Sequence, residues 1–229
     1  TQEILRICAC IGNRFDLESL AVVSGKSINE TLTDLNSAIQ EDMISLHGNL
    51  YKFHHDRIQE AAYSMIPENE KAAMHYRIGT NVLDKTDTNN LNDKIFYIVD
   101  QLNRGIRLVS GIDEELRLAH LNLQAAQKSK KSTAYVSASS YLKTAMGLLP
   151  DYCWTSHYDL TYAIYREAIE CEYFNLNFSE AEKIFDIVVR NAKSNIDKAN
   201  VHTLMIILYT TQGNYEAALR VGLEGMKMV

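Results

Sequence analysis

Proline occurs only twice in this chain of 229 residues, at Pro67 and Pro150. Because proline ends or kinks a helix, a chain of this length with so few prolines can form helix after helix. Hydrophobic residues make up 46% of the chain and charged residues 23%, which is typical of a folded globular protein and not of a disordered one. The sequence therefore predicts a mainly all-α protein.

The first 66 residues carry a pattern of their own. Apolar periodicity predicts three helices there, and Ser27 and Glu30 have the spacing of a capping box at the start of the third. Alternating side chains around a central glycine predict a hairpin near Ile44–Phe53, and a further helix is expected from about His55 to Met65. This order is that of a winged helix, a variant of helix-turn-helix.

From residue 67 onward the sequence gives no strand signal, and amphipathic stretches predict a succession of helices. The expected helices are Glu68–Leu83, Leu91–Leu108, Asp113–Lys128, Thr133–Leu148, Trp154–Phe174, Ser179–Ala192, Asp197–Thr211 and Tyr215–Met228. Short connections between them imply antiparallel neighbours.

Three short motifs within this helical part resemble the turn of a tetratricopeptide repeat. They are Thr133–Ala138, Leu176–Ala181 and Gly213–Ala218, and each ends on an alanine that lets paired helices approach closely. Their spacings exceed the usual period of about 34 residues, so the repeats are irregular. We therefore expect a winged-helix domain at residues 1–66 and a tetratricopeptide-like helical repeat domain at residues 67–229.

The common motifs of enzymes are missing from the chain. It contains no GxxxxGK[ST], GxGxxG, HExxH or GxSxG segment, so neither nucleotide hydrolysis nor any other catalysis is expected of it, and no catalytic residue or cofactor is assigned. Cys8 and Cys10 form a lone CxC pair, which can bind a soft metal ion but fits two small buried side chains as well. We assign no metal site.

A winged helix raises the question of DNA binding. The helix expected to read a groove contains Glu30, Asp34 and Glu41 but no Lys or Arg, only Lys26 precedes it, and the whole chain has a net charge of -6. Phosphates repel such a surface, so direct nucleic-acid binding is not expected. No run of eighteen apolar residues occurs either, so we expect no membrane contact and a cytoplasmic location.

The segment from the second hairpin strand into the next helix contains His54-His55-Asp56. In a purely structural interpretation, Asp56 caps the helix and His55 satisfies the backbone of the wing. The segment also resembles the end of the winged helix in the STAND class of signal-transduction ATPases, which carries a Met-His-Asp motif there. The resemblance implies that His55 contacts the phosphate of bound ADP and that Asp56 orients it, with His54 in place of the methionine.

A closer resemblance covers nearly the whole chain. The strings IGNRFDLESLAVVSG, FHHDRIQEAAYSMIPENEKAAMHYRIG, IFYIVDQLNRG and STAYVSASSYLKTAMGLL are similar to the middle of large bacterial fusion proteins. Those proteins join a serine/threonine-kinase-like domain, a STAND/AAA-type ATPase, helical repeats, a GAF domain and a sensor histidine kinase of the two-component type. The kinase and ATPase domains would then precede Thr1, and the GAF and histidine-kinase domains would follow Val229.

This resemblance implies a non-catalytic regulatory fragment. Its partners would be the ATPase, kinase, GAF and histidine-kinase domains of the same protein, and ATP or ADP with Mg would bind to that parent protein and not to this fragment. The helical repeats would bind a protein or other effector. The alternative is an inducer-sensing fragment of a STAND-type transcription regulator.

Two further surface features have competing interpretations. Trp154, Tyr158, Tyr162 and Tyr165 fall at helical spacing, so they either line a groove that binds a protein or peptide partner or form the core between repeats. The basic cluster Lys128–Lys131 is predicted to be a solvated loop between helices.

Overall fold

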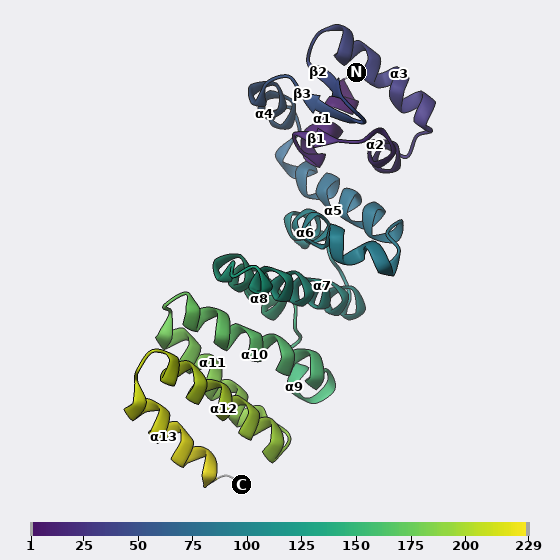
Figure 1. The fold of residues 1–229 in the computed structure, drawn as a ribbon. Coiled ribbons are helices and arrows are strands. Elements are labelled where there is room, and N and C mark those ends of the chain that lie inside the picture. The colour runs from purple at the N-terminus through teal and green to yellow at the C-terminus, as the bar shows by residue number, and fades with distance from the viewer. Residues whose placement is uncertain (1, 228–229) are drawn as a thin grey trace. The chain divides into compact units, whose positions relative to one another are not determined.

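The computed structural model describes residues 2–227 and divides the chain into two compact units, Thr1–Ser110 and Gly111–Val229 (Figure 1). Helices predominate in both units, and the one sheet among the described residues lies in the first. The predicted mainly all-α fold class is therefore confirmed. The predicted domain boundary after residue 66 stays a prediction, because the compact units divide at a later point of the chain.

The first unit begins with a winged helix, because its elements follow the order helix, strand, helix, helix, strand, strand. These elements are α1 (Gln2–Ile11), β1 (Arg14–Phe15), α2 (Leu17–Ser24), α3 (Ile28–Gln40), β2 (Ile44–His47) and β3 (Leu50–Phe53). The unit continues with α4 (Asp56–Ser64), α5 (Glu68–Asp84), α6 (Thr88–Arg104) and the short 3-10 helix η1 (Ile106–Leu108).

Local signals set the start of α3 as the sequence predicts. The Ser27 side chain accepts a hydrogen bond from the backbone of Glu30, and the Glu30 carboxylate accepts one from the backbone of Ser27. This reciprocal pair satisfies two donors that the first turn of a helix leaves free.

The sheet contains one strand more than the predicted hairpin. β3 lies between β1 and β2, and all pairings are antiparallel, with Phe15 of β1 opposite Tyr51 of β3. Phe15, Tyr51 and Phe53 are buried in the core that α1 covers. β1 has two residues and shows no alternation along the sequence, so only its pairing with β3 makes it a strand.

A buried chain of polar groups links the winged helix to α5 and α6. Gln101 donates from Nε2 to the carbonyl of Cys10 over 3.0 Å, which leaves its Oε1 to accept from Nδ1 of His75 at 2.7 Å. The other imidazole nitrogen of His75, Nε2, then accepts from the hydroxyl of Tyr63 at 3.0 Å. These directions are those of the neutral imidazole, which burial favours because it lowers the pKa of His75. The chain thereby connects α1, α4, α5 and α6.

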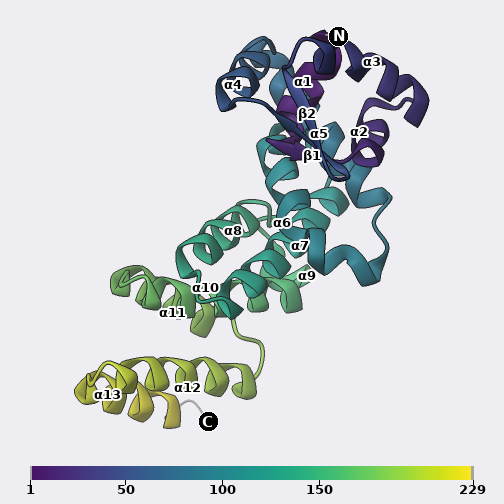
Figure 2. The same cartoon turned by 45° about the horizontal axis from the view of Figure 1, so that its top comes forward.

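The second unit consists of antiparallel helix pairs, and Figure 2 shows the helices of a pair side by side. Its elements are α7 (Ile112–Lys131), α8 (Tyr135–Gly147), α9 (Cys153–Ser156), α10 (Tyr158–Phe174), α11 (Phe178–Asn191), α12 (Asn195–Thr211) and α13 (Tyr215–Met226). The three alanines of the repeat motifs, Ala138, Ala181 and Ala218, are all buried, as close helix packing requires.

Three sequence predictions are wrong in detail. The helix expected to reach Leu108 ends at Arg104, and after Gly105 the chain tightens into the separate 3-10 helix η1. Gly105 lies so close to α5 that an added Cβ would be 2.6 Å from Cβ of Tyr76. The helix expected to begin at Trp154 is split at His157 into α9 and α10.

The third concerns the basic cluster, which is the last turn of α7 and not a loop. Lys130 pairs with Glu167 at 2.5 Å and with Glu170 at 3.0 Å, both on α10. Cations are also favourable at a helix C-terminus, which stabilises this turn.

The buried histidine makes a prediction about pH. Burial, with the nearby charges of Arg104 and Lys71, lowers the pKa of His75 below its ordinary value of 6.5. The unfolded chain therefore takes up a proton below about pH 6.5 that the folded unit resists, so the first unit is fully stabilised above that pH and loses stability as the pH falls.

Thermal unfolding of the first unit, followed by circular dichroism at pH 7.5 and 5.5, checks this. We expect His75→Gln to reduce the pH dependence and the same substitution at the exposed His47 to preserve it. An identical pH dependence in wild type and His75→Gln contradicts the assignment.

Candidate functional site

The predicted nucleotide-sensing residues lie where the wing passes into α4. The backbone N–H of His54 donates to the carbonyl of Met43 at 3.0 Å, which closes the end of the sheet. His55 occupies the N-cap position of α4, but its side chain makes no capping hydrogen bond. Asp56 is the first helical residue, and its Oδ1 accepts from the side-chain amide of Asn13 at 3.0 Å.

This geometry corrects the structural interpretation of the segment. Asp56 does not cap α4, because it lies inside the first turn, and the wing backbone is satisfied by His54 and not by His55. The side chains of His54 and His55 are exposed, and their rings meet edge to face with centroids 5.1 Å apart. His55 is therefore free to contact a group outside the described residues at the positive end of a nine-residue helix, where anions are favoured.

The helix that would read a DNA groove is acidic and its neighbouring cation is neutralised. Glu30 and Glu41 are exposed, and Lys26 forms an ion pair of 2.7 Å with Asp34. This arrangement leaves α3 without a free positive charge for phosphate contacts.

The predicted aromatic stripe is engaged within the repeat unit. The Tyr158 hydroxyl donates to Asp197 at 2.8 Å and accepts from the backbone N–H of Lys193 at 3.0 Å, and the Tyr162 hydroxyl donates to the carbonyl of Asp197 at 3.0 Å. Trp154 packs on Tyr165 and Tyr158 with ring centroids 5.1 and 6.1 Å away. Burial raises the pKa of Tyr158 to about 12, as expected for a hydroxyl between packed helices. Partner binding by the stripe stays a prediction.

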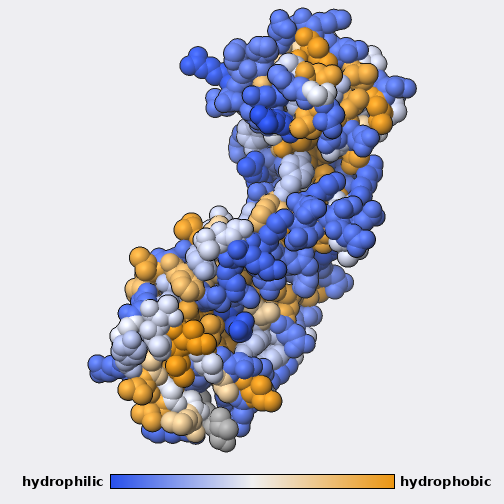
Figure 3. All heavy atoms as spheres, in the orientation of Figure 1, coloured by the Kyte–Doolittle hydropathy of each residue, from blue (hydrophilic) through white to orange (hydrophobic). Residues whose placement is uncertain are grey.

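A more exposed apolar surface lies on α13, and sequence analysis did not single it out. Tyr215, Leu219, Leu223 and Met226 are 65%, 68%, 55% and 70% exposed. Figure 3 shows apolar atoms gathered over this end of the repeat unit. The four positions follow one helical face, which was the signal available in the sequence. We call these four residues the α13 stripe.

Corresponding positions in the two preceding repeats contact the next helix. The residue directly after the buried alanine of each repeat motif is Ser139 in α8, Glu182 in α11 and Leu219 in α13, so these three positions are equivalent. Ser139 donates to Glu172 of α10, and Glu182 accepts from the hydroxyl of Tyr209 of α12 at 2.5 Å. Leu219 thus occupies a position that receives a helix in the repeats before it.

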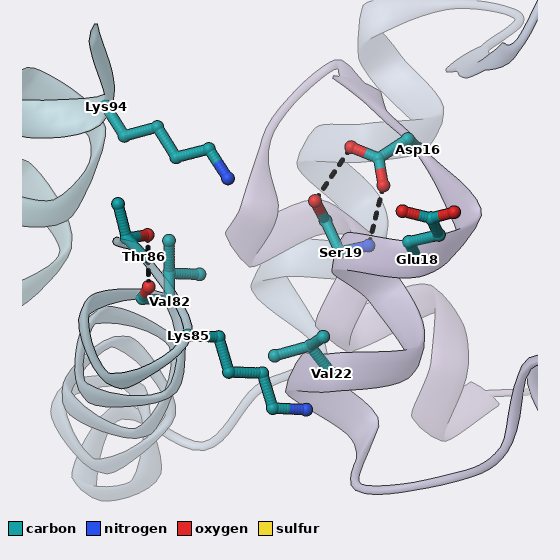
Figure 4. A pocket seen from close by; sticks show the side chains of 8 residues that line it. All are labelled: Asp16, Glu18, Ser19, Val22, Val82, Lys85, Thr86 and Lys94. Atoms are coloured by element: carbon teal, nitrogen blue, oxygen red, sulfur yellow. Dashed lines mark hydrogen bonds between the residues drawn. The ribbon is translucent and has the colours of Figure 1, made fainter. Parts of the chain in front are cut away.

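One pocket in the first unit, of about 280 Å³, lies between α2 and the α5–α6 connection (Figure 4). Lys85 and Lys94 project from one side, and Asp16 and Glu18 lie on the other. Asp16 already accepts hydrogen bonds from the backbone and hydroxyl of Ser19, so it belongs to the cap of α2. This pocket has mixed charges and favours neither anions nor cations.

The two cysteines of the CxC pair are buried in α1. Burial raises the pKa of both thiols, that of Cys10 to about 11, and the Cys10 thiol lies 3.2 Å from the sulfur of Met74. No group of three or more potential metal ligands occurs in the described part of the chain. Nor does any helix within residues 2–227 have the length and apolar character needed to cross a membrane.

Comparison with known proteins found one similar curated sequence and one similar solved structure, while no family model matches the chain. The chain is 27% identical to hybrid signal transduction histidine kinase G of Dictyostelium discoideum, over 99% of this chain and 8% of that protein. It therefore spans a small part of its relative. A STAND protein with a tetratricopeptide repeat sensor from Pyrococcus horikoshii aligns with a TM-score of 0.39 and 15% identity, over 99% of this chain and 44% of that one.

The hydrogen bonds of Tyr158 predict its contribution to stability. Tyr158→Phe leaves Asp197 and the Lys193 N–H without this partner, so it should destabilise the repeat unit by about 1–2 kcal/mol. Trp154 is the single tryptophan, so its fluorescence during urea unfolding reports on this unit. Tyr215→Phe, on an exposed residue, is the control and should have no effect. Equal stability of wild type and Tyr158→Phe argues against a structural role for the stripe.

Proposed function

We propose that this chain is a non-catalytic regulatory region of a multidomain signal-transduction protein. In this proposal the winged helix responds to the nucleotide state of an ATPase core outside the chain, and the repeat unit receives a protein partner. Support comes from the similarity to a hybrid signal transduction histidine kinase along nearly the whole chain. The acidic α3 supports a role in protein contact over DNA contact.

The observation that carries the nucleotide-sensing part is the exposed His55 at the uncapped start of α4. Its side chain has no hydrogen-bond partner among the described residues, although Asp56 beside it is held in place by Asn13. The backbone of His55 is held at the start of α4, while its imidazole can donate a hydrogen bond to a phosphate oxygen. The positive end of the helix dipole also favours an anion at this place. The contact would exist only while the winged helix lies against nucleotide, so it would favour that arrangement.

Replacing His55 with Ala in the longer protein tests this role. A charge-assisted hydrogen bond contributes about 1.5–3 kcal/mol, so ADP affinity should fall about ten- to a hundred-fold and the protein should shift towards its active state. Isothermal titration with ADP measures the affinity.

His54→Ala is the matched control and should retain ADP affinity, since His54 is the exposed neighbour. The thermal midpoint of the 229-residue chain should be unchanged by His55→Ala, because the His55 side chain is exposed and does not cap α4. Unchanged ADP affinity together with a lower midpoint would overturn the proposal in favour of a structural His55.

For the repeat unit, the α13 stripe is the better candidate for partner contact. Its side chains are exposed, whereas the aromatic stripe is half-buried against α12 and the residues before it. Because Ser139 and Glu182 each bond to the helix that follows, the occupant of the α13 stripe is an amphipathic helix. An apolar side chain of that helix would bury Leu219, at the place where the earlier repeats have Glu172 and Tyr209.

Hydrogen exchange tests whether α13 is covered in the longer protein. Backbone amides of α13 should exchange at least about tenfold more slowly there than in the 229-residue chain, and those of α11 should not change. Leu219→Glu in the longer protein should restore fast exchange, whereas Val136→Glu, at another exposed apolar position, should not. Equal exchange of α13 in both proteins would contradict this docking surface.

A further inference from the structure

A second pocket in the first unit has three cationic side chains and one carboxylate in its lining. It has a volume of about 310 Å³ and lies between α4, the start of α5, the end of α6 and η1. The residues that carry its chemistry are Tyr63, Glu68, Lys71, His75, Arg104 and Arg107. This pocket is separate from the exposed His55, and no motif in the sequence points to it.

The positive charges of the pocket come from three different elements. Lys71 belongs to α5, Arg104 ends α6 and Arg107 lies in η1. Glu68 is the one carboxylate in the lining, and it pairs with Lys71 at 2.6 Å. The charges of Lys71 and Glu68 cancel each other, so the positive charges of Arg104 and Arg107 are not balanced by a carboxylate in the lining of the pocket.

One of the two arginines is held in place by the backbone. Nη2 of Arg107 donates to the carbonyls of Asn69 at 2.9 Å and of Glu68 at 3.4 Å, which anchors its guanidinium at the start of α5. A guanidinium has five donors, so further N–H groups remain for a ligand. Arg104 has no hydrogen-bond or ion-pair partner among the described residues, and its charge reaches the buried His75.

Two members of the polar hydrogen-bond chain line the pocket. Tyr63 and His75 line it and are hydrogen-bonded to each other, so this side of the pocket belongs to the chain that joins α1, α4, α5 and α6. Ala72 and Ile106 supply an apolar part of the wall. The pocket thus combines two uncompensated guanidinium groups with the hydrogen-bonded pair of Tyr63 and His75. Its apolar wall can contact the organic part of a small ligand that carries an anionic group.

We propose that this pocket binds a phosphate group of a small molecule. A phosphate dianion matches two uncompensated positive charges, and planar guanidinium groups bind its oxygens with paired hydrogen bonds. The source is either inorganic phosphate or the phosphate of a small organic ester, for which Ile106 and Ala72 provide contact. Binding would stabilise the first unit, since the ligand joins α5, α6 and η1.

Nuclear magnetic resonance titration of the 229-residue chain tests the site directly. The probes are inorganic phosphate and glycerol 3-phosphate, at constant ionic strength held with chloride. We expect saturable shifts of the His75 ring resonances with a midpoint in the millimolar range, and no shift of the His202 ring in the other unit. Tighter binding of the ester assigns the site to an organic phosphate, and equal or weaker binding assigns it to inorganic phosphate.

Variants separate this site from general salt effects. Arg104→Gln should weaken binding about ten- to a hundred-fold, because it removes a charge-assisted hydrogen bond. Lys94→Gln, at an exposed lysine of the other pocket, should bind as wild type does. Arg107→Lys keeps the positive charge but removes the planar guanidinium that forms paired hydrogen bonds, so this variant should lose part of the phosphate affinity. It replaces Arg104→Gln as the test if that variant fails to fold.

Two results would overturn the proposal: His75 shifts that rise linearly with phosphate without saturation, or equal binding by wild type, Arg104→Gln and Arg107→Lys. His55→Ala should leave phosphate binding at this pocket intact, so its outcome is independent of the nucleotide-sensing proposal.

Discussion

The buried chain from Tyr63 through His75 and Gln101 to the Cys10 carbonyl is the interaction on which the first unit depends. A polar group without a partner in a core costs more than a hydrogen bond returns, so each member of the chain fixes the next. The consequence is that α5 and α6 belong to the same compact body as the winged helix. The wing that presents His55 and the cationic pocket are therefore both built on this one body.

In the repeat unit, buried polar contacts also set how helices follow one another. Glu172 accepts from Ser139 and Asn177 and pairs with Lys143, which ties α10 to α8 and to the turn before α11. The next repeat replaces this arrangement with Tyr209 and Glu182. In α13 the equivalent position is the apolar Leu219, which is exposed and makes no such polar contact. This change of chemistry is the reason for proposing α13 as a docking face.

The candidate site was only partly visible in the sequence. His55 and Asp56 could be placed at the end of the wing because a hairpin and a helix start are local events, and the structure puts both there. Their partners could not be placed, since Asn13 reaches Asp56 from a distant part of the chain. The same holds for the aromatic stripe, whose helical spacing was evident but whose bonds to Lys193 and Asp197 arise from the packing of α12.

The sequence alone determined the features that depend on neighbours along the chain. These are the helical class from the scarcity of proline, the capping box at Ser27, the β2–β3 hairpin and the acidic face of α3. Tertiary structure decided the β1 strand, the close approach of Gly105 to Tyr76 and the gathering of Lys71, Arg104 and Arg107 around one pocket. A cap or a turn is stabilised within a few residues, whereas a third strand or a cluster of charges exists only when folding brings distant segments together.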